Sequence, residues 1–397
     1  MKFQQSVSFS DTSIAFSSKS DKELKKMHFL FRVMNYPLLV NLGTNFLKVA
    51  LKLNLPVKSL IKRTIFEQFC GGETIYDCRD KSLELSKYGI DTILDYSVEG
   101  TEDEADFEQN AREILDVIDK SGIAPKNPFV VFKFSGIASN AIMKKLQNKQ
   151  ALSSKEQNSW QTTRKRLKDI CEACNEEEVK VLIDAEESWI QDVIDEQVYE
   201  LMEQYNQENA LVYNTYQMYR KDMLVKLREA HRKANSNGYH LGAKLVRGAY
   251  MEKERDRAKE LGYPNPIHPD KQATDEDFNR ALKYCVENIR DIGLCCGSHN
   301  EYSNLYLTEL MDEFDVERHD PRIYFAQLYG MSDNISFNLA NAGYNVAKYL
   351  PYGPVEDVIP YLFRRAEENT AIAGQSSREL SLVKKEISRR AAESRRA

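Results

Sequence analysis

The sequence predicts an α/β protein whose main domain is a (β/α)8 barrel of the TIM type, preceded by an N-terminal helical arm. Two observations carry this prediction. After Tyr88 and Gly89, short apolar or β-branched runs alternate with helical segments of ten or more residues. Eight such runs follow one another, and this number, with the chain length, suits a closed barrel better than the alternative of an open doubly wound sheet.

The runs read as buried parallel strands, and helical patterns fill most of the intervals between them. The predicted strands are Thr92–Tyr96, Phe129–Phe134, Val179–Ile183, Leu211–Tyr213, Ala243–Val246, Gly293–Cys296, Ile323–Ala326 and Tyr344–Ala347. The predicted helices include Asp106–Lys120, Gln197–Gln207, Gln217–Ala234, Asp275–Ile292 and Tyr302–Phe314.

Three segments follow from this pattern. We expect residues 1–88 to form the helical arm, 89–376 the barrel and 377–397 a basic C-terminal helix. The first long helix of the arm would bury Leu24, Met27, Leu30, Phe31 and Met34, which recur at helical spacing. The polar stretch of about 140–178 is longer than a crossover needs, and we interpret it as a surface helical insertion.

The C-terminal helix has two possible roles. Leu380, Val383 and Ile387 fall on one side of it, and its end is made cationic by Arg389, Arg390, Arg395 and Arg396. The short apolar stripe favours packing on the barrel, and the arginines leave contact with an anionic membrane surface as the alternative.

Composition excludes several classes of protein. The chain has 397 residues, of which 42% are apolar and 29% charged, and no apolar run reaches the roughly 20 residues of a transmembrane helix. The net charge of −6 argues against a general nucleic-acid binder. Seven cysteines without a signal peptide indicate reduced thiols and a cytoplasmic protein. Cys171 and Cys174 have metal-site spacing, but without a second pair we read them as an ordinary helix face.

Polar residues follow nearly every predicted strand. Barrel enzymes carry their working residues at the C-terminal ends of the strands, so these positions are candidates for a site. Lys133, Lys244 and Arg247 would make that mouth cationic, with Asp184 in partial balance. Such a mouth suits an anionic substrate, a phosphorylated cofactor, or both.

Other signatures are missing. The sequence contains neither a G-x-G-x-x-G fingerprint nor a P-loop, and no cluster with metal-ligand spacing is visible. From the residues alone, two further classes stay open: a lyase or aldolase that uses Lys133 or Lys244 as a Schiff-base amine, and a binding protein without catalysis.

The stretch from Tyr349 to Asn369 is the most specific motif of the chain. A turn through Pro351, Gly353 and Pro354 leads to a helix with Tyr-Leu-Phe-Arg-Arg and then Glu-Glu-Asn. Adjacent arginines suit a carboxylate or phosphate, because each guanidinium offers a planar fork of donors. With Lys244-Leu-Val-Arg-Gly-Ala-Tyr250 and Ile183-Asp-Ala-Glu-Glu187, this stretch resembles the proline dehydrogenase family over about residues 72–369.

The resemblance implies that the barrel is distorted and that the protein carries out an FAD-dependent oxidation of L-proline to Δ1-pyrroline-5-carboxylate. It also implies that electrons pass to a membrane quinone, which allows peripheral contact at the inner membrane. No part of the chain resembles an aldehyde dehydrogenase, so a monofunctional enzyme is expected. The cofactor contacts implied are Ala185, Asn214, Lys244, Arg247, Gly248, Ala249, Tyr250, Ser298, His299 and Glu368. The family often has arginine where this chain has Lys244, which keeps the charge but loses the fork.

The resemblance also implies roles around the substrate. Lys133, Arg364 and Arg365 would hold the carboxylate, while Leu328, Tyr349 and Tyr361 would pack on the ring. The residues implied to be catalytic are Lys133, Asp184, Lys244 and Tyr349, with Asp184 orienting Lys133 or a tyrosine. Glu73 would be a gate that pairs with the first arginine. A hydroxyproline dehydrogenase is the close alternative, although the Tyr349 ring should fill the space that a 4-hydroxyl needs.

Overall fold

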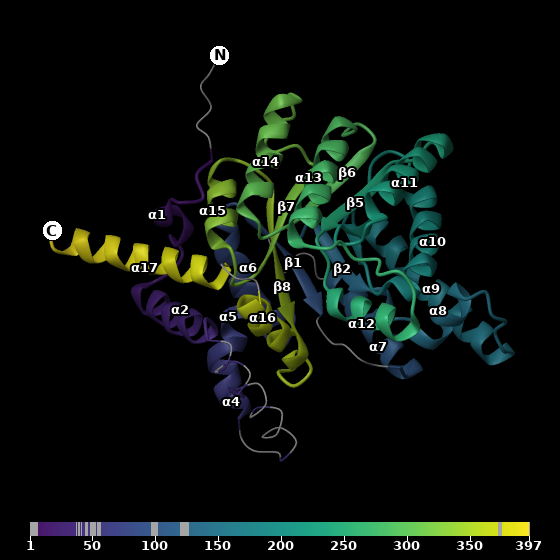
Figure 1. Cartoon of the computed structure of the whole chain (residues 1–397), viewed down its shortest axis with the longest axis horizontal. Helices are drawn as coiled ribbons and strands as arrows, with labels where there is room; N and C mark the ends of the chain where they lie inside the picture. The colour runs from purple at the N-terminus through teal and green to yellow at the C-terminus, as the bar shows by residue number, and fades with distance from the viewer. Residues whose placement is uncertain are drawn as a thin grey trace.

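The computed structural model describes residues 7–36, 57–96, 102–119, 127–371 and 375–396, together with 38, 40, 42, 43, 47 and 53. The side chains of 366–371, 375 and 376 are outside this description. A ring of parallel strands forms the centre of the molecule, and helices surround it (Figure 1). The strands are β1 (Ile90–Tyr96), β2 (Phe129–Lys133), β3 (Lys180–Asp184), β4 (Val212–Gln217), β5 (Leu241–Val246), β6 (Ile292–Gly297), β7 (Ile323–Leu328) and β8 (Val346–Tyr352).

The sheet order is β1-β8-β7-β6-β5-β4-β3-β2, and every ladder is parallel. Among the described residues, neighbouring strands share ladder hydrogen bonds everywhere except between β1 and β2, which nevertheless lie side by side. The predicted (β/α)8 barrel is therefore confirmed, and among the described residues its ring lacks ladder hydrogen bonds at one seam, between β1 and β2.

The helices that connect the strands cover the outside of the ring. They are α7 (Glu104–Asp119), α8 (Asn140–Gln147), α9 (Ser154–Glu176), α10 (Ser188–Tyr205), α11 (Met223–Asn237), α12 (Met251–Leu261), α13 (Lys271–Glu287), α14 (Glu301–Glu313), α15 (Asp333–Asn341) and α16 (Ile359–Ala371). The prediction for residues 140–178 needs a correction. α9 is the β2–β3 crossover helix itself, since Leu167, Ile170 and Cys171 are buried in the barrel's outer core, so only α8 is additional.

Two strand ends also differ from the prediction. β8 runs to Tyr352 instead of ending at Ala347, because Tyr349 is still in register with Ile93 of β1 and Leu328 of β7. Gln217, expected in a helix, is the last residue of β4 and pairs with Val246. In both cases the neighbouring strands extend the ladder beyond the local apolar run.

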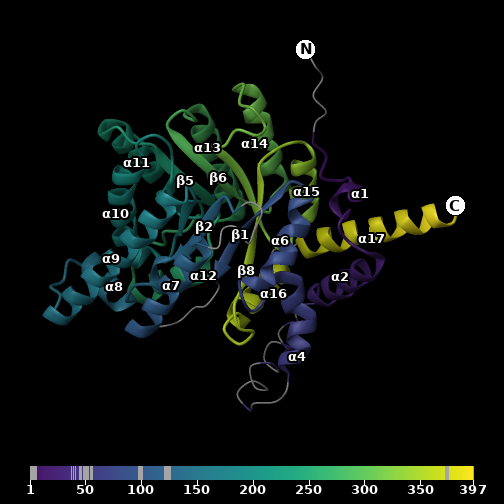
Figure 2. The same cartoon turned by 180° about the vertical axis from the view of Figure 1, so that it is seen from behind.

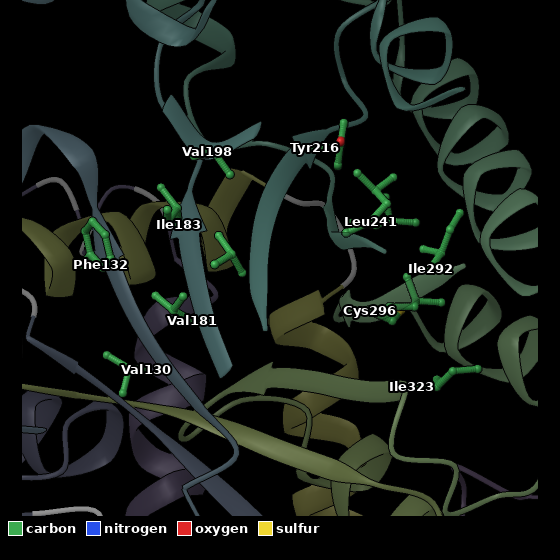
Figure 3. Packing of buried hydrophobic residues seen from close by; sticks show 14 of the residues in the cluster. Val130, Phe132, Val181, Ile183, Val198, Tyr216, Leu241, Ile292, Cys296 and Ile323 are labelled. Atoms are coloured by element: carbon green, nitrogen blue, oxygen red, sulfur yellow. The ribbon is translucent and has the colours of Figure 1, made fainter. Parts of the chain in front are cut away.

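Alternate residues of each strand face opposite sides, and this produces two separate apolar clusters. The outer cluster lies between the ring and the helices; Figure 3 shows part of it, with Val130 and Phe132 on β2 beside Val181 and Ile183 on β3. The inner cluster fills the barrel and consists of Ile93, Phe129, Val131, Leu182, Ala210, Tyr213, Cys295, Tyr324, Ala326, Ala347 and Tyr349. Membership of one cluster or the other identifies which side chains face the barrel axis.

The N-terminal arm and the C-terminal helix form one unit at the side of the barrel (Figures 1 and 2). The arm contains α1 (Thr12–Ala15), α2 (Asp21–Met34), α4 (Lys58–Ile61), α5 (Glu67–Phe69) and α6 (Arg79–Ser86), and the C-terminal helix is α17 (Gln375–Ser394). A third cluster buries Phe31 of α2, Leu362 of α16 and Val383 of α17 together. α17 therefore packs on α2 and α16, as its apolar stripe favoured. In the described part of the chain, no helix combines the length and hydropathy needed to cross a bilayer.

Candidate active site

The inward-facing residues at the C-terminal ends of the strands meet at one mouth of the barrel. Lys244 of β5 is 5% exposed, and its Nζ lies 2.5 Å from Oδ1 of Asp184 on β3. The same ammonium lies 4.5 Å from the ring centroid of Tyr349 on β8. Lys133 ends β2 in register with Asp184 and shares the inward side with Phe129. The four residues predicted to be catalytic thus end up on inward-facing positions of four strands.

Tyr349 brings a buried hydroxyl to this mouth. Its side chain is 6% exposed, and none of the described residues hydrogen-bonds to its hydroxyl. Burial, with the nearby Asp184 as a smaller cause, raises the pKa of the phenol well above its ordinary value. Tyr349 therefore stays protonated, with a hydrogen-bond donor that nothing in the described part of the protein uses.

Leu328 connects the barrel interior with the helix that carries the arginines. It ends β7 on the inward side and packs against both the inner cluster and the cluster that contains Tyr361 of α16. Arg365 stacks its guanidinium 5.1 Å from the Tyr361 ring centroid, and Arg364 beside it is half-buried. The predicted ring-packing residues are thus joined into one apolar surface, with the two arginines on the same helix.

Arg247 is held by a set of oxygen acceptors at the end of β5. Its guanidinium donates to Oδ1 of Asp275 at 2.6 Å, to Oγ of Ser298 at 2.9 Å and to Oγ of Ser303 at 2.9 Å. It also lies 4.4 Å from the ring centroid of Phe278. Ser303 is in the first turn of α14, so a guanidinium and the N-terminus of a helix face the same place. That combination suits the phosphates of a dinucleotide.

His299 uses both ring nitrogens inside the protein. Nε2 accepts the N–H of Leu328 at 3.3 Å, which leaves Nδ1 to donate to Oγ of Ser332 at 2.9 Å. Burial, helped by the neighbouring charges of Lys348, Arg365 and Arg247, lowers the pKa of the imidazole to about 3. His299 is therefore neutral, and only its carbon edges and faces are left for a cofactor.

Asn214 does not point into the mouth. It alternates with the inward-facing Tyr213 of β4, and its amide donates 2.9 Å to Oδ1 of Asp195 on α10. Its direction differs from the predicted cofactor contact because β4 continues past Tyr213, which turns Asn214 to the helix side. Gln217, like Thr215, is a polar residue that β4 does present inward: Nε2 donates to the Glu186 carbonyl at 2.7 Å, and Oε1 accepts the Ala249 N–H at 3.3 Å.

Glu186 is a second residue of the site that the sequence reasoning did not single out. Its carboxylate accepts the N–H of Ser135 at 2.7 Å and the hydroxyl of Ser135 at 2.5 Å. Burial raises the pKa of this carboxyl to about 7, although both bonds to Ser135 oppose the shift. Because Ser135 lies two residues after Lys133, Glu186 ties the end of β2 to the end of β3. Complete burial of a glutamate is the signal of such a role, and only the structure reveals it.

Glu73 is placed differently from the predicted gate. Its carboxylate forms an ion pair with Lys62 of the arm, whereas the prediction pairs it with an arginine of α16. Both partners are partly exposed, so the pair is weakly held and open to exchange.

The remaining predicted contacts lie on loops at the strand ends. Gly248 has φ +128°, and a Cβ there would lie 1.6 Å from the Tyr219 ring, so only glycine fits. Ala185 is buried directly after β3. The ring centroid of Tyr250 lies 5.5 Å from Nζ of Lys253. The side chain of Glu368 is outside the described residues.

Comparison with known proteins identifies the family. A family model described as proline dehydrogenase matches residues 78–378. Proline dehydrogenase 1 of Dictyostelium discoideum is 33% identical over 96% of this chain and 74% of its own length, and hydroxyproline dehydrogenase of Xenopus laevis is 32% identical over 98% and 91%.

Solved structures agree in fold. Proline utilization A from Bdellovibrio bacteriovorus, inactivated by N-propargylglycine, superposes with a TM-score of 0.71 at 21% identity, which supports the fold alone. The match covers 91% of this chain but 38% of that longer chain. The barrel, its inward-facing cationic mouth and the family match lead to one conclusion: the chain belongs to the proline dehydrogenase family.

Proposed function

We propose that the protein oxidises L-proline to Δ1-pyrroline-5-carboxylate with FAD as its cofactor. The observation that carries the proposal is the mouth formed by Lys244, Asp184 and Tyr349, with the apolar surface of Leu328 and the arginine helix beside it. When bound, FAD would supply the acceptor for a hydride from carbon C5 of proline. Two electrons and one proton leave C5 together as hydride, and the amine proton goes to solvent.

The chain's own residues would bind and orient the substrate. Arg364, Arg365 and Lys133 are the cations proposed to hold the carboxylate through charge-assisted hydrogen bonds. Leu328, Tyr349 and Tyr361 would pack on the ring and keep water away from it, which is catalysis by orientation. Because the proline amine must be neutral when the hydride leaves, turnover should rise with pH until that amine is deprotonated.

The residues present fit the cofactor. Arg247 with Ser298 and the start of α14 would hold the pyrophosphate, because a guanidinium and a helix N-terminus both favour anions. Gln217 would offer an amide from the inward side of β4, and Lys244 would lie near the redox-active ring. Glu368, Ala185, Gly248, Ala249, Tyr250 and His299 are proposed as further contacts.

Electrons are proposed to pass to a membrane quinone, and the protein to be cytoplasmic with peripheral contact at the inner membrane. Arg389 and Arg390 of α17 are committed to Glu386 and Asp21, which weakens the idea that they face lipid. The outward side of α2 is the better candidate, since it exposes Phe29 and Arg32.

A visible spectrum tests the proposal. Purified protein, reconstituted with FAD where needed, should be yellow, and L-proline added without oxygen should bleach the flavin band. Buffer without proline is the control. A protein that stays colourless after reconstitution, or a yellow one that proline does not bleach, would contradict the proposal.

Hydroxyproline dehydrogenase is a second candidate, supported by the similarity to the Xenopus laevis enzyme. The Tyr349 ring beside Lys244 supports proline, because with the substrate bound as proposed the ring would occupy the space that a 4-hydroxyl needs. Measuring kcat/KM for L-proline and trans-4-hydroxyproline on the same preparation separates the two candidates, and a higher value for hydroxyproline would reverse the assignment.

A further inference from the structure

A network of buried charges lies behind β7 and β8, on the side of the barrel wall away from the mouth. Lys348 of β8 is completely buried and faces outward, since it alternates with the inward-facing Tyr349. Its Nζ lies 2.9 Å from Oδ1 of Asp333 and donates to the carbonyl oxygens of Met331 at 2.5 Å and Leu328 at 3.4 Å. One ammonium thus holds the loop that connects β7 with α15.

The C-terminal helix reaches into this network through Glu379. Oε1 of Glu379 accepts the N–H of Ser332 at 2.6 Å, and the hydroxyl of Ser332 is the partner of His299. Ser332 adopts φ +52° and ψ +40°, a left-handed conformation that is costly for any residue with a Cβ. The contact with Glu379 stabilises this conformation, since it fixes the direction of the Ser332 N–H.

The network ends on a residue of the mouth. The N–H of Leu328 donates to His299, and its carbonyl accepts from Lys348, so the peptide groups on both sides of Leu328 are fixed. The Leu328 side chain faces inward and packs against both the barrel interior and the α16 cluster. A chain of direct contacts therefore joins α17 to the apolar wall of the mouth.

We propose that Glu379 of the C-terminal helix is a positioning residue: through Ser332 and His299 it holds Leu328 where that side chain closes the wall against the substrate ring. The proposal rests on the function proposed above for the identity of the substrate. It makes α17 a support of the substrate site, although α17 belongs to the third cluster and not to the apolar interior of the barrel.

The charges around Glu379 make this role sensitive to pH. Asp333 of α15, Glu301 of α14 and Lys348 of β8 face it, and Lys19, in the turn after α1, faces Asp333. Burial, followed by Asp333, raises the pKa of Glu379 to about 7, although the Ser332 N–H and Lys348 oppose the shift. Protonation near neutral pH removes the negative charge that holds the Ser332 N–H.

Glu379→Gln in the full-length holoenzyme tests the proposal. It keeps the shape but not the charge, so KM for L-proline at pH 8 should rise about fivefold while kcat stays within about twofold, less than the loss of a direct substrate hydrogen bond. The matched control is Glu386→Gln, which removes another buried carboxylate from the same helix, one that forms ion pairs with Arg389 and Arg390 and has no part in the contacts around Ser332 described above. It should lower Tm and leave KM unchanged.

The pH dependence separates positioning from a general structural effect. The ratio of KM between Glu379→Gln and wild type cancels the ionisation of proline itself. It should be largest at pH 8 and fall toward one by pH 6, because wild-type Glu379 is then protonated as well. A ratio that does not change with pH, or a KM equal to that of wild type at pH 8, would overturn the proposal.

Hydrogen exchange gives a readout that needs no turnover. In Glu379→Gln, the amide of Ser332 should exchange at least about tenfold faster than in wild type at pH 8, since its acceptor is weakened. Unchanged exchange would contradict the proposal even if proline proved not to be the substrate. If Glu379→Gln does not fold, Ser332→Ala replaces it: loss of the His299 partner should raise KM at every pH, and an unchanged KM would count against the link.

Discussion

Two lysine–aspartate pairs of the barrel are chemically alike and differ in the side of the wall that they face. Lys244 in β5 pairs with Asp184 at the end of β3. Lys348 in β8 pairs with Asp333, which lies beyond the end of β7. Both lysines are buried, at 5% and 0% exposure. However, Lys244 faces the barrel axis, whereas Lys348 faces the helices.

The difference follows from the alternation of side chains along a strand. A residue that faces the barrel axis can contact a ligand, whereas its neighbour in the strand faces the helices and supports the barrel wall. The Asp184 side chain is 25% exposed, so the inward pair keeps one side toward the mouth. The Asp333 side chain is 8% exposed, and the ammonium of Lys348 is also engaged by two carbonyl groups. The inward pair is available to a ligand, while the outward pair is fully used in holding the loop after β7.

The largest effect is expected from breaking the outward pair. Lys348→Met leaves Asp333 and two carbonyl groups buried without their cation, which should lower the free energy of unfolding by about 3–5 kcal/mol. Urea denaturation followed by circular dichroism measures it. Lys244→Met is the control and should cost only about 1 kcal/mol, because water can reach Asp184. Equal losses for the two variants would remove the distinction between the pairs.

The inward pair should dominate activity instead. Lys244→Met is expected to lower kcat for L-proline by about 100-fold, the order seen when one preorganised donor is removed from an active site. Lys180→Met is the matched control, because Lys180 starts β3 at the opposite end of the barrel and covers the rings of Phe129 and Tyr324. Steady-state kinetics should show nearly unchanged kcat for it, and a comparable loss in both variants would argue against a local role of Lys244.

The arginines of α16 extend the comparison to cations that would touch the substrate. Arg364→Met or Arg365→Met should raise KM for L-proline by about tenfold or more, since a hydrogen bond to a charged group contributes roughly 1.5–3 kcal/mol. Arg389→Met on α17 serves as the control for the loss of one surface charge. A wild-type KM in an Arg364 or Arg365 variant would show that this arginine does not hold the carboxylate.

Tyr349 sharpens the comparison at the mouth. Tyr349→Ser should raise kcat/KM for trans-4-hydroxyproline relative to L-proline by a few-fold, because it opens the space beside Lys244. Tyr349→Phe keeps the ring and removes the hydroxyl, so it should leave the ratio near the wild-type value. An unchanged ratio in the serine variant would mean that the ring does not exclude the hydroxyl group.

The smallest effect is on the pH dependence of stability near the outward pair. The pKa of Glu379 is raised from 4.5 to about 7 in the folded protein. Between these values the native state binds more protons than the unfolded state, so the stability that Glu379 contributes falls as pH rises. The Tm of Glu379→Gln minus that of wild type should therefore increase by about 2–4 °C from pH 5 to pH 8.

The protonation of His299 changes stability with pH in the opposite direction to that of Glu379. Because His299 is present in both proteins, its effect cancels in the Tm difference. Its pKa is lowered from 6.5 to about 3, so its contribution to stability falls as pH drops below 6.5. Glu186, with a pKa raised to about 7, is likewise present in both proteins. A difference in Tm that stays flat across this pH range would show that Glu379 does not titrate there.

Local pattern predicted the barrel and part of its site. Lys133, Asp184 and Lys244 lie in or at the end of short apolar runs, where a period of two decides which side a residue faces. The directions of the Asn214 and Tyr349 side chains were harder to predict, because the runs predicted around them stopped short of the true strand ends. For such residues the extent of the ladder, set by neighbouring strands, decides the direction of the side chain.

By itself, the sequence determined that this is an eight-stranded α/β barrel with cations at the C-terminal ends of its strands, because apolar periodicity and residue type are local properties. The tertiary structure alone decided which of those groups are joined: Glu73 with Lys62, Asn214 with Asp195, and Glu379 with Ser332, which is 47 residues away in the chain. Such pairs depend on how separate elements pack, and burial then sets their charge and strength.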